Sequence, residues 1–463
     1  MGKKGEFIFL LLWKKEREDA HEILRRKFDD IFEKVDKDEK KLLKRIFVIQ
    51  SYEGRYPENA ISKLGDKDDI VDKLDSLEKK GHISRAKFIE TYHPALCKEF
   101  IKIGKKEFPV ELVIQYLEEY LENIDKKREY FGDLFGIGTN IVIEKDMHLI
   151  PEAVKFLKEA TNIKGIKKEE KVMALNNLGI AFADWAGLIK KDNPEEAKQK
   201  YNEALKCFDK ALEIDPKDAK VWNNKGEALR RWKKYEEAIE CYDKALEINE
   251  KYAKAWNNKG LALGNLGKYD EALKYYDKAL EIDKNLAEAW YNKGLALGKL
   301  GRYKEAIECF DKALEIDSNL AEAWIGKGIA LSDLARLIEK EKPEEAKQKY
   351  EEAIKAIGNA AFLFYIEGRI ENAYRHFAEV YYMEIDLPIR YECGVAYGAI
   401  LCLGNELYDA VVGECWKHKD EISSSARVVL EYLVGGKKGE IKEVKNEKDM
   451  VFKDLMEKLK VQK

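Results

Sequence analysis

The chain has 463 residues, enough for two or three ordinary domains or for one extended repeat array with flanking segments. Its 84 basic and 88 acidic residues leave a net charge of −4, so no global attraction to nucleic acid or to an anionic membrane is expected. The seven cysteines include no Cys-x-x-Cys pair, which argues against zinc and dithiol redox motifs and favours reduced cysteines in a cytoplasmic protein.

The first feature along the chain is a seven-residue apolar run from Phe7 to Trp13. No small-residue cleavage site follows it, and Lys14 and Lys15 come directly after it, so a signal peptide is not expected. The run is also too short to span a bilayer. We expect a buried strand or the start of a helix here, and no membrane association.

Residues 1–165 lack the repeat period described below and are expected to form a helical N-terminal domain. Within it, residues 39–92 have the pattern of a helix, a short helix, a third helix and an extended segment. The stretch from Leu74 to Ile83 resembles the end of the third helix and the wing of a winged helix-turn-helix domain. The helix that would read DNA, Asp66 to Asp75, carries five aspartates and two lysines, which would repel phosphates. A docking or structural role is therefore favoured over DNA reading.

The stretch from residue 108 to residue 160 has a mostly helical pattern. Its three glycines, Gly132, Gly136 and Gly138, predict loops. The run Ile141 to Ile143 is β-branched and predicts a short strand.

A period of 34 residues dominates the middle of the chain. Each of four equally spaced tryptophans is followed four residues later by glycine, namely Trp222, Trp256, Trp290 and Trp324 with Gly226, Gly260, Gly294 and Gly328. Tyrosine, alanine and further aromatic positions repeat in step. One helical hairpin cannot bury its own apolar face but stacked neighbours can, so the period predicts an array of hairpins.

These residues resemble the tetratricopeptide repeat family. Trp222, Gly226, Ala238, Tyr242 and Pro216 match its pattern, and the next two units match nearly as well. Lysine replaces the usual leucine before each glycine, at Lys225, Lys259, Lys293 and Lys327. The resemblance implies a mostly all-α fold, a right-handed α-solenoid of stacked hairpins over residues 172–366.

The array is predicted to contain two long units around three regular ones. The units are 172–218, 219–252, 253–286, 287–320 and 321–366. Both long units contain the same octapeptide, at 194–201 and 343–350, and their extra 13 residues predict about two added turns on both helices of the hairpin.

The repeat pattern weakens after the array. Residues 367–435 are expected to form degenerate helical repeats that cap the array. Residues 436–463 are expected to form a charged tail with a short helix, because Val451, Leu455 and Leu459 share one helical face.

The sequence predicts no enzyme, no metal and no cofactor. It has no phosphate-binding loop, no His-Glu-x-x-His and no nucleophile elbow, and its six histidines are at least 11 residues apart. Cys207, Cys241 and Cys309 occupy one repeat position, too far apart for a disulfide or a shared metal. They are expected to pack as small apolar residues.

The strongest candidate for a binding site is an asparagine ladder. The residue two before the glycine is asparagine in four successive units, at Asn177, Asn224, Asn258 and Asn292. In tetratricopeptide proteins this position lines the concave surface, and in O-linked N-acetylglucosamine transferase such a ladder grips a peptide backbone. A carboxamide suits that role because it donates and accepts hydrogen bonds. The alternative is that the residue was copied by duplication, or bonds only to nearby backbone.

The neighbouring positions bear on the kind of ligand. The residue after each tryptophan is Asn223, Asn257, Tyr291 or Ile325, and the residue after each glycine is Glu227, Leu261, Leu295 or Ile329. The lysine and asparagine half of the carboxylate clamp of tetratricopeptide co-chaperones is therefore absent. Recognition of a C-terminal carboxylate is disfavoured, and the apolar positions suit ligand side chains.

Together these features predict an interaction scaffold or adaptor that binds a peptide segment of a partner protein in the concave groove. The alternative is a DNA-associated regulator with an N-terminal winged helix and a repeat region that senses a partner. The sequence identifies neither the partner nor the oligomeric state.

Overall fold

The computed structural model describes a large part of the chain. The described residues are 35–51, 56–57, 110–123, 128–143, 147–383, 387–403, 409–435, 441 and 446–462, with isolated positions between 73 and 90. The run from Phe7 to Trp13 and most of the stretch from Asp66 to Asp75 lie outside them. The chain divides into two compact units, Met1–Asn249 and Glu250–Lys463, and each is described by itself.

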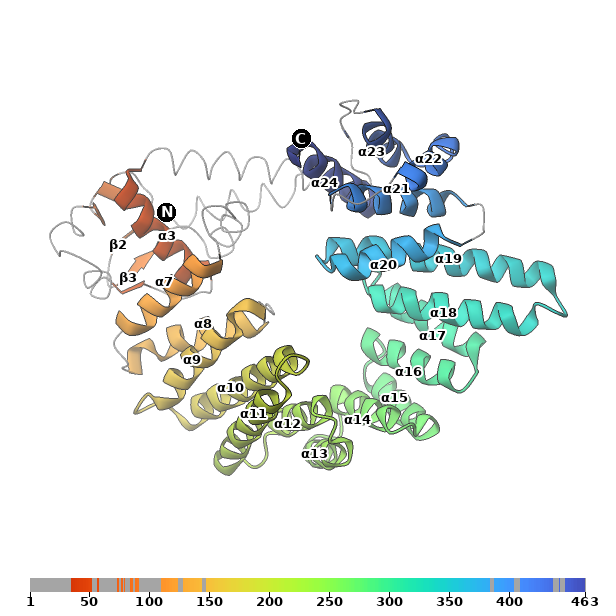
Figure 1. The fold of residues 1–463 in the computed structure, drawn as a ribbon. Coiled ribbons are helices and arrows are strands. Elements are labelled where there is room, and N and C mark those ends of the chain that lie inside the picture. The colour runs from red at the N-terminus through yellow and green to blue at the C-terminus, as the bar shows by residue number, and fades with distance from the viewer. Residues whose placement is uncertain are drawn as a thin grey trace. The chain divides into compact units, whose positions relative to one another are not determined.

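In the described part of the first unit, one helix and three short strands precede a series of helices (Figure 1). The strands form an antiparallel sheet of order β1-β3-β2. The elements are α3 (Lys37–Ser51), β1 (Tyr56–Pro57), β2 (Ser84–Arg85), β3 (Phe88–Glu90), α7 (Val110–Asn123), the 3-10 helices η1 (Arg128–Tyr130) and η2 (Met147–Leu149), α8 (Phe131–Ile143), α9 (Ile150–Asn162), α10 (Lys168–Ile189), α11 (Pro194–Ile214), α12 (Ala219–Arg231) and α13 (Tyr235–Ile248).

The segment that resembles a winged helix is described only in part. Leu42, Leu43 and Ile46 of α3 are buried, as are Leu74 and Leu77. Strands β2 and β3 pair in the stretch where the sequence predicts an extended segment. Most residues between 52 and 92 lie outside the described part of the chain, so the winged helix stays a prediction.

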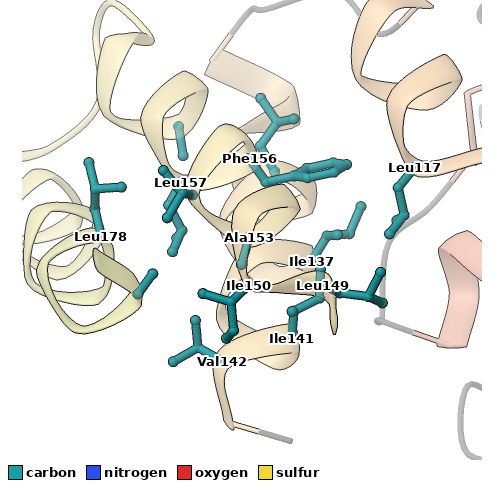
Figure 2. Packing of buried hydrophobic residues seen from close by; sticks show 14 of the residues in the cluster. Leu117, Ile137, Ile141, Val142, Leu149, Ile150, Ala153, Phe156, Leu157 and Leu178 are labelled. Carbon is teal, nitrogen blue, oxygen red and sulfur yellow. The ribbon is translucent and has the colours of Figure 1, made fainter. Parts of the chain in front are cut away.

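The loops predicted at Gly132, Gly136 and Gly138 and the strand predicted at Ile141 to Ile143 are wrong, because α8 runs through all of them. The physical reason is contact with α9. A Cβ atom on Gly138 would lie 2.7 Å from Cγ of Leu157, so glycine here allows two helices to approach closely. Figure 2 shows the apolar side chains that α8 and α9 bury together. Tertiary packing overrides the local preference of glycine and β-branched residues.

The core of the first unit continues from α3 to α12 as one cluster of buried hydrophobic residues. Leu178 of α10 belongs to the same cluster as Leu157 of α9 (Figure 2). The loss of the 34-residue period near residue 165 is therefore not accompanied by a break in the core.

The second unit continues the hairpins and ends in a group of shorter helices (Figure 1). Its helices are α14 (Ala253–Asn265), α15 (Tyr269–Ile282), α16 (Ala287–Lys299), α17 (Tyr303–Ile316), α18 (Ala321–Ile338), α19 (Pro343–Ile366), α20 (Ile370–Tyr381), α21 (Pro388–Leu403), α22 (Asp409–Lys417), α23 (Ser424–Gly435) and α24 (Glu447–Gln462).

Glycine ends the first helix of two regular hairpins. Gly267 and Gly301 have φ angles of 78° and 75°, in the left-handed region that glycine adopts without strain. Beside Gly267, the backbone N–H of Lys268 donates to the carbonyl of Leu263, which closes the helix end in a Schellman-type turn. The chain then reverses and starts the second helix.

Both helices of each long hairpin are longer than those of the regular hairpins, as predicted. Regular first and second helices have 13 and 14 residues. In the long hairpins, α10 and α11 have 22 and 21 residues, and α18 and α19 have 18 and 24. The proline at the start of α11 and of α19 suits the first helical turn, where its missing N–H costs nothing.

The C-terminal helix α24 packs on the rest of the second unit. The face predicted from Val451, Leu455 and Leu459 is confirmed, since all three are buried. The Tyr365 hydroxyl of α19 donates to Asp454 of α24 at 2.6 Å. This helix therefore docks on the end of the array.

The predicted fold class, a mostly α-helical solenoid of stacked hairpins, is confirmed. Within the described residues, α10 is long and apolar enough to cross a membrane by length and composition alone. Half of its apolar window is buried in the structure, and buried core helices meet the same criterion.

Candidate functional site

The candidate site lies on the first helices of the hairpins, α10 and α12 in the first unit and α14, α16 and α18 in the second. Within each unit these helices contact one another in succession. We use "first-helix face" for the side of these helices that carries the asparagine positions and the residue after each repeat glycine, such as Gly260 or Gly294.

In the second unit the asparagines bond to one another. Nδ2 of Asn292 on α16 donates to Oδ1 of Asn257 on α14 at 3.0 Å, and Nδ2 of Asn257 approaches Oδ1 of Asn258 at 3.4 Å. All three side chains are buried. The carboxamides thus connect neighbouring first helices, where a buried polar group needs a partner.

The first unit has the same arrangement and extends it by one helix. Nδ2 of Asn224 on α12 donates to Oδ1 of Asn176 on α10 at 3.0 Å. Asn176 donates to Asn177 at 3.1 Å, and Asn177 donates to the hydroxyl of Thr139 on α8 at 3.0 Å. Asn177 and Asn224 are half-buried, unlike the fully buried pair in the second unit.

The structure therefore gives the predicted ladder a role in packing, and peptide contact by its amides stays a prediction. Sequence reasoning missed Asn176 altogether and predicted Asn257 only as a groove residue, whereas both accept the hydrogen bond from the next hairpin. The signal for them was present as the repeated Asn-Asn dipeptide at 176–177, 223–224 and 257–258.

The residue after each glycine differs in chemistry between the units. Leu295 and Ile329 are 37% and 55% exposed, and Leu261 is half-buried. Glu227 in the first unit instead accepts two hydrogen bonds from Arg230, at 2.8 and 2.6 Å. At this position the second unit carries only apolar residues, whereas the first unit carries Ile180 on α10 and the paired Glu227 on α12.

Tyr291 occupies the position of Asn223 and Asn257 in its own unit. Its ring packs against Phe310 with centroids 6.0 Å apart. Burial, followed by the carboxylate of Glu322, raises the pKa of its hydroxyl. Tyr291 is therefore neutral at physiological pH, with its ring half-buried in the face.

The lysine that replaces the family's leucine links two hairpins. Lys293 forms an ion pair with Asp277 of the preceding hairpin at 2.6 Å. Its ammonium group also lies 5.5 Å from the centre of Trp290, and Lys312 lies 4.3 Å from the same ring. The Trp290 indole N–H donates to the carbonyl of Lys284 at 3.0 Å. Cation–π contacts of this kind stabilise partly exposed tryptophans.

This arrangement recurs in the other units. Lys225 pairs with Asp209 and Lys327 pairs with Asp311, each at 2.5 Å. The indole N–H of every repeat tryptophan bonds to a carbonyl six residues earlier, with distances of 2.8 to 3.1 Å for Trp222, Trp256, Trp290 and Trp324. Lysine in place of the family's leucine thus replaces apolar packing with ion pairs between neighbouring hairpins.

The equivalent cysteines Cys207, Cys241 and Cys309 are buried and free, as predicted. Burial raises the pKa of each thiol to about 11. Within the described residues, no group of three or more His, Cys, Asp and Glu side chains is arranged to hold a metal ion.

At pH 8 these three thiols are expected to react with iodoacetamide about 100-fold more slowly in the folded chain than in urea. A pKa of about 11 in place of 9 lowers the thiolate fraction by that factor. The contribution of this pKa shift to the free energy of unfolding is full below pH 9. It is lost as the pH rises from 9 to 11, because the unfolded chain loses its thiol protons first. Mass spectrometry of labelled peptides measures the rates, with the half-buried Cys402 as internal control. Equal rates for Cys402 and the repeat cysteines in the folded chain would contradict the prediction.

Comparison with known proteins agrees with this geometry. The tetratricopeptide repeat model matches residues 219–252, 253–286 and 287–320, and a second repeat model of the same family matches 197–231. No curated protein sequence matches the chain.

Several solved structures are similar to part of the chain. A crystal structure of MamA is 21% identical, covers 35% of this chain and 92% of its own, and has a TM-score of 0.30. YrrB, described as a TPR protein with an unusual peptide-binding site, is 27% identical, with coverages of 38% and 86% and a TM-score of 0.28. The first TPR of Spaghetti (RPAP3), bound to an HSP90 peptide, is 26% identical, with coverages of 26% and 96% and a TM-score of 0.25. On the match of three consecutive segments and of a fourth that overlaps the first of them, residues 197–320 of this chain are tetratricopeptide repeats.

Proposed function

We propose that this protein is an interaction scaffold without chemistry of its own, and that it binds a peptide segment of a partner on the first-helix face. The observation that carries the proposal is the exposure of Leu295 and Ile329 at equivalent positions of two contacting helices. Single exposed aliphatic residues are ordinary on protein surfaces, whereas a row of them repeated on adjacent helices is typical of a binding surface.

The asparagines would form the polar base of this site. A carboxamide has two N–H groups and an oxygen with two lone pairs, so one ladder hydrogen bond does not exhaust its capacity. Asn177 and Asn224 are half-buried and so retain access to a ligand backbone. Tyr291, Glu227 and Leu261 complete the predicted site around them, whereas Asn223 and Asn257, which were also predicted here, are buried.

Replacing Leu295 and Ile329 together by lysine is expected to weaken capture of the natural partner by at least about tenfold. The reason is that the substitution places two ammonium groups against an apolar ligand. The full chain is used as bait, and crosslinked partners are quantified by mass spectrometry. Both positions are exposed, so the fold is expected to survive the change, which circular dichroism checks.

The matched control is the double replacement of Ile282 and Ile316 by lysine. These residues are 40% and 39% exposed and end α15 and α17, which are second helices and do not carry the first-helix face. The control is expected to retain every partner. If the Leu295 and Ile329 variant keeps its partners equally well, the proposed site is wrong.

The DNA-associated alternative depends on the stretch from Asp66 to Asp75, which lies largely outside the described residues. None of the described contacts favours it.

A further inference from the structure

The last turns of α19 and the helix α20 form a further hairpin with the geometry of the regular ones. Gly368 between them has a φ angle of 76°, close to the 75° of Gly301 between α16 and α17. In both turns the backbone N–H of the residue after the glycine donates at 2.9 Å to a carbonyl of the preceding helix, from Arg302 to Leu297 and from Arg369 to Phe364. The end of α19 therefore corresponds to the end of the first helix α16.

This correspondence adds a fourth member to the series of residues that follow the repeat glycines. Phe362 stands two residues before the accepting carbonyl in α19, as Leu295 does in α16. We use "apolar row" for the four equivalent residues Leu261, Leu295, Ile329 and Phe362. Leu295 and Ile329 are 37% and 55% exposed, whereas Phe362 is 1% exposed. The apolar row is thus open on the earlier hairpins and covered at α19.

The C-terminal helix α24 covers this end of the apolar row. The Phe452 ring of α24 meets the Phe362 ring edge to face, with centroids 5.6 Å apart. Three residues further along α19, the Tyr365 hydroxyl donates to Asp454 at 2.6 Å and accepts from the ammonium group of Lys458 at 3.0 Å. Residues i and i+3 share a helix face, so α24 lies on the face of α19 that carries the row.

The same helix extends over α21, the first helix of the next hairpin, and over α23. The main contacts of α24 are with α19, α21 and α23, whereas the second helices α20 and α22 are not among them. Lys448 forms an ion pair with Glu392 of α21 at 3.2 Å. The Tyr432 hydroxyl of α23 donates to the carbonyl of Leu459 at 3.0 Å. α24 is therefore bound along the first helices of the C-terminal hairpins.

The element that covers the row is an amphipathic helix. The residues on its inner side are at most 2% exposed, namely Val451, Phe452, Leu455, Met456 and Leu459. Its exposed residues include Glu457, Lys458 and Lys460. This spacing places the apolar residues on one helical face and the charged ones on the other. The chain itself thus shows which kind of element the apolar row accepts.

The open part of the row also suits a helix better than an extended peptide. Its ladder asparagines, Asn257, Asn258 and Asn292, are buried, and Asn292 is bonded to Asn257 at 3.0 Å. In the next hairpin the ladder position is Gly326, which has no side chain to donate. An extended peptide needs partners for its backbone N–H and C=O groups, whereas an α-helix pairs them internally. The buried carboxamides of this unit do not offer such partners.

We propose, on the basis of the function proposed above, that Leu261, Leu295 and Ile329 bind an amphipathic α-helix of a partner protein, as Phe362 binds α24. The apolar side of that helix carries aromatic and aliphatic residues on successive turns and contacts the row, while its polar side faces solvent. Because α24 already occupies the C-terminal end of the row, the partner helix is limited to the hairpins before α19.

The test uses the full chain and three fluorescein-labelled peptides in anisotropy titrations. The first has the sequence of α24, Glu447–Gln462. The second has the same composition with the apolar residues distributed around the helix. The third has proline in place of Lys453 and Glu457, which leaves the apolar residues and the net charge unchanged but prevents helix formation. The first peptide is expected to bind at least about tenfold more tightly than either of the others.

A double variant and its control assign the binding to the open part of the row. Leu295→Gln with Ile329→Gln is expected to weaken binding of the first peptide at least about tenfold, because two apolar contacts are lost. The control, Ile282→Gln with Ile316→Gln on the second helices, is expected to leave it unchanged. All four side chains are exposed, so the fold is expected to persist, which circular dichroism checks. A peptide that merely displaced α24 would be insensitive to the first variant, and that result would overturn the inference.

Failure of the inference and failure of the proposed function give different results. Equal or tighter binding of the second or third peptide would overturn the helical ligand, and so would absence of binding by all three. The proposed function would still stand if the natural partner is lost from the variant with lysine at Leu295 and Ile329. Retention of the natural partner by that lysine variant would instead overturn the proposed function.

Discussion

Replacing Gly294 by alanine is expected to lower the free energy of unfolding by about 1–3 kcal/mol. Gly294 lies where α16 crosses α17, and a Cβ atom there would be 2.8 Å from Cε1 of Phe310. Phe310 is buried and also lies against Gly326 of α18 in the next hairpin, so its ring cannot move aside without opening other contacts. The methyl group therefore forces the two helices apart. Urea unfolding followed by circular dichroism measures the change.

The control is the same substitution at Gly298, four residues later in the same helix. A Cβ atom there meets nothing within 4 Å. Alanine should therefore stabilise the helix by about 0.5–1 kcal/mol through its higher helix propensity. Both variants change glycine to alanine in the same helix. A lower free energy of unfolding at Gly294 and a higher one at Gly298 would therefore assign the difference to the contact between α16 and α17. A neutral or stabilising change at Gly294 would show that the crossing is not tight.

The same close approach is repeated along the array. A Cβ atom on Gly226 would lie 2.6 Å from Cε1 of Tyr242, and one on Gly260 would lie 2.8 Å from Cε1 of Tyr276. This repetition explains why the helical array could be predicted from the sequence. In the three regular units the crossing pairs glycine on one helix with an aromatic ring on the other at one fixed separation, whereas Gly328 of the last unit meets Ile357 instead.

Other features depend on contacts that the local sequence does not contain. Gly138 has the composition of a loop residue, and only the presence of α9 beside α8 turns it into a helix contact. In the repeats, lysine in place of leucine gave no indication of its partner, because Asp277 lies 16 residues before Lys293 on another hairpin. Such pairs follow from the stacking of hairpins and cannot be found by comparing one unit with the family pattern.

The positions of the candidate site residues could be predicted from the sequence, but whether each one packs between helices or faces solvent could not. Periodicity alone placed Asn258, Asn292, Leu295 and Ile329 at equivalent points of neighbouring helices. The structure shows that their solvent exposure differs: Asn258 and Asn292 are buried, whereas the side chains of Leu295 and Ile329 are exposed. Burial depends on the angle at which hairpins stack, and no single unit encodes that angle.

The hydrogen bond between Asn292 and Asn257 is expected to contribute measurably to stability. Asn257→Ala leaves the buried Nδ2 group of Asn292 without its acceptor and should cost about 1–3 kcal/mol. Asn292→Ala should cost a similar amount, and the double variant should cost less than the sum. The expected coupling energy is about 0.5–1.5 kcal/mol in a double-mutant cycle measured by urea unfolding.

The control is Asn265→Ala at the exposed end of α14, which should change stability by less than about 0.5 kcal/mol. A strong coupling would mean that joint replacement of Asn224, Asn258 and Asn292 disturbs the stacking of hairpins as well as any peptide contact. Loss of partner binding in that triple variant would then have two causes. A coupling near zero would contradict the structural role, and the amides would then be free to serve the ligand. The cycle therefore has to precede any test of the ladder by binding.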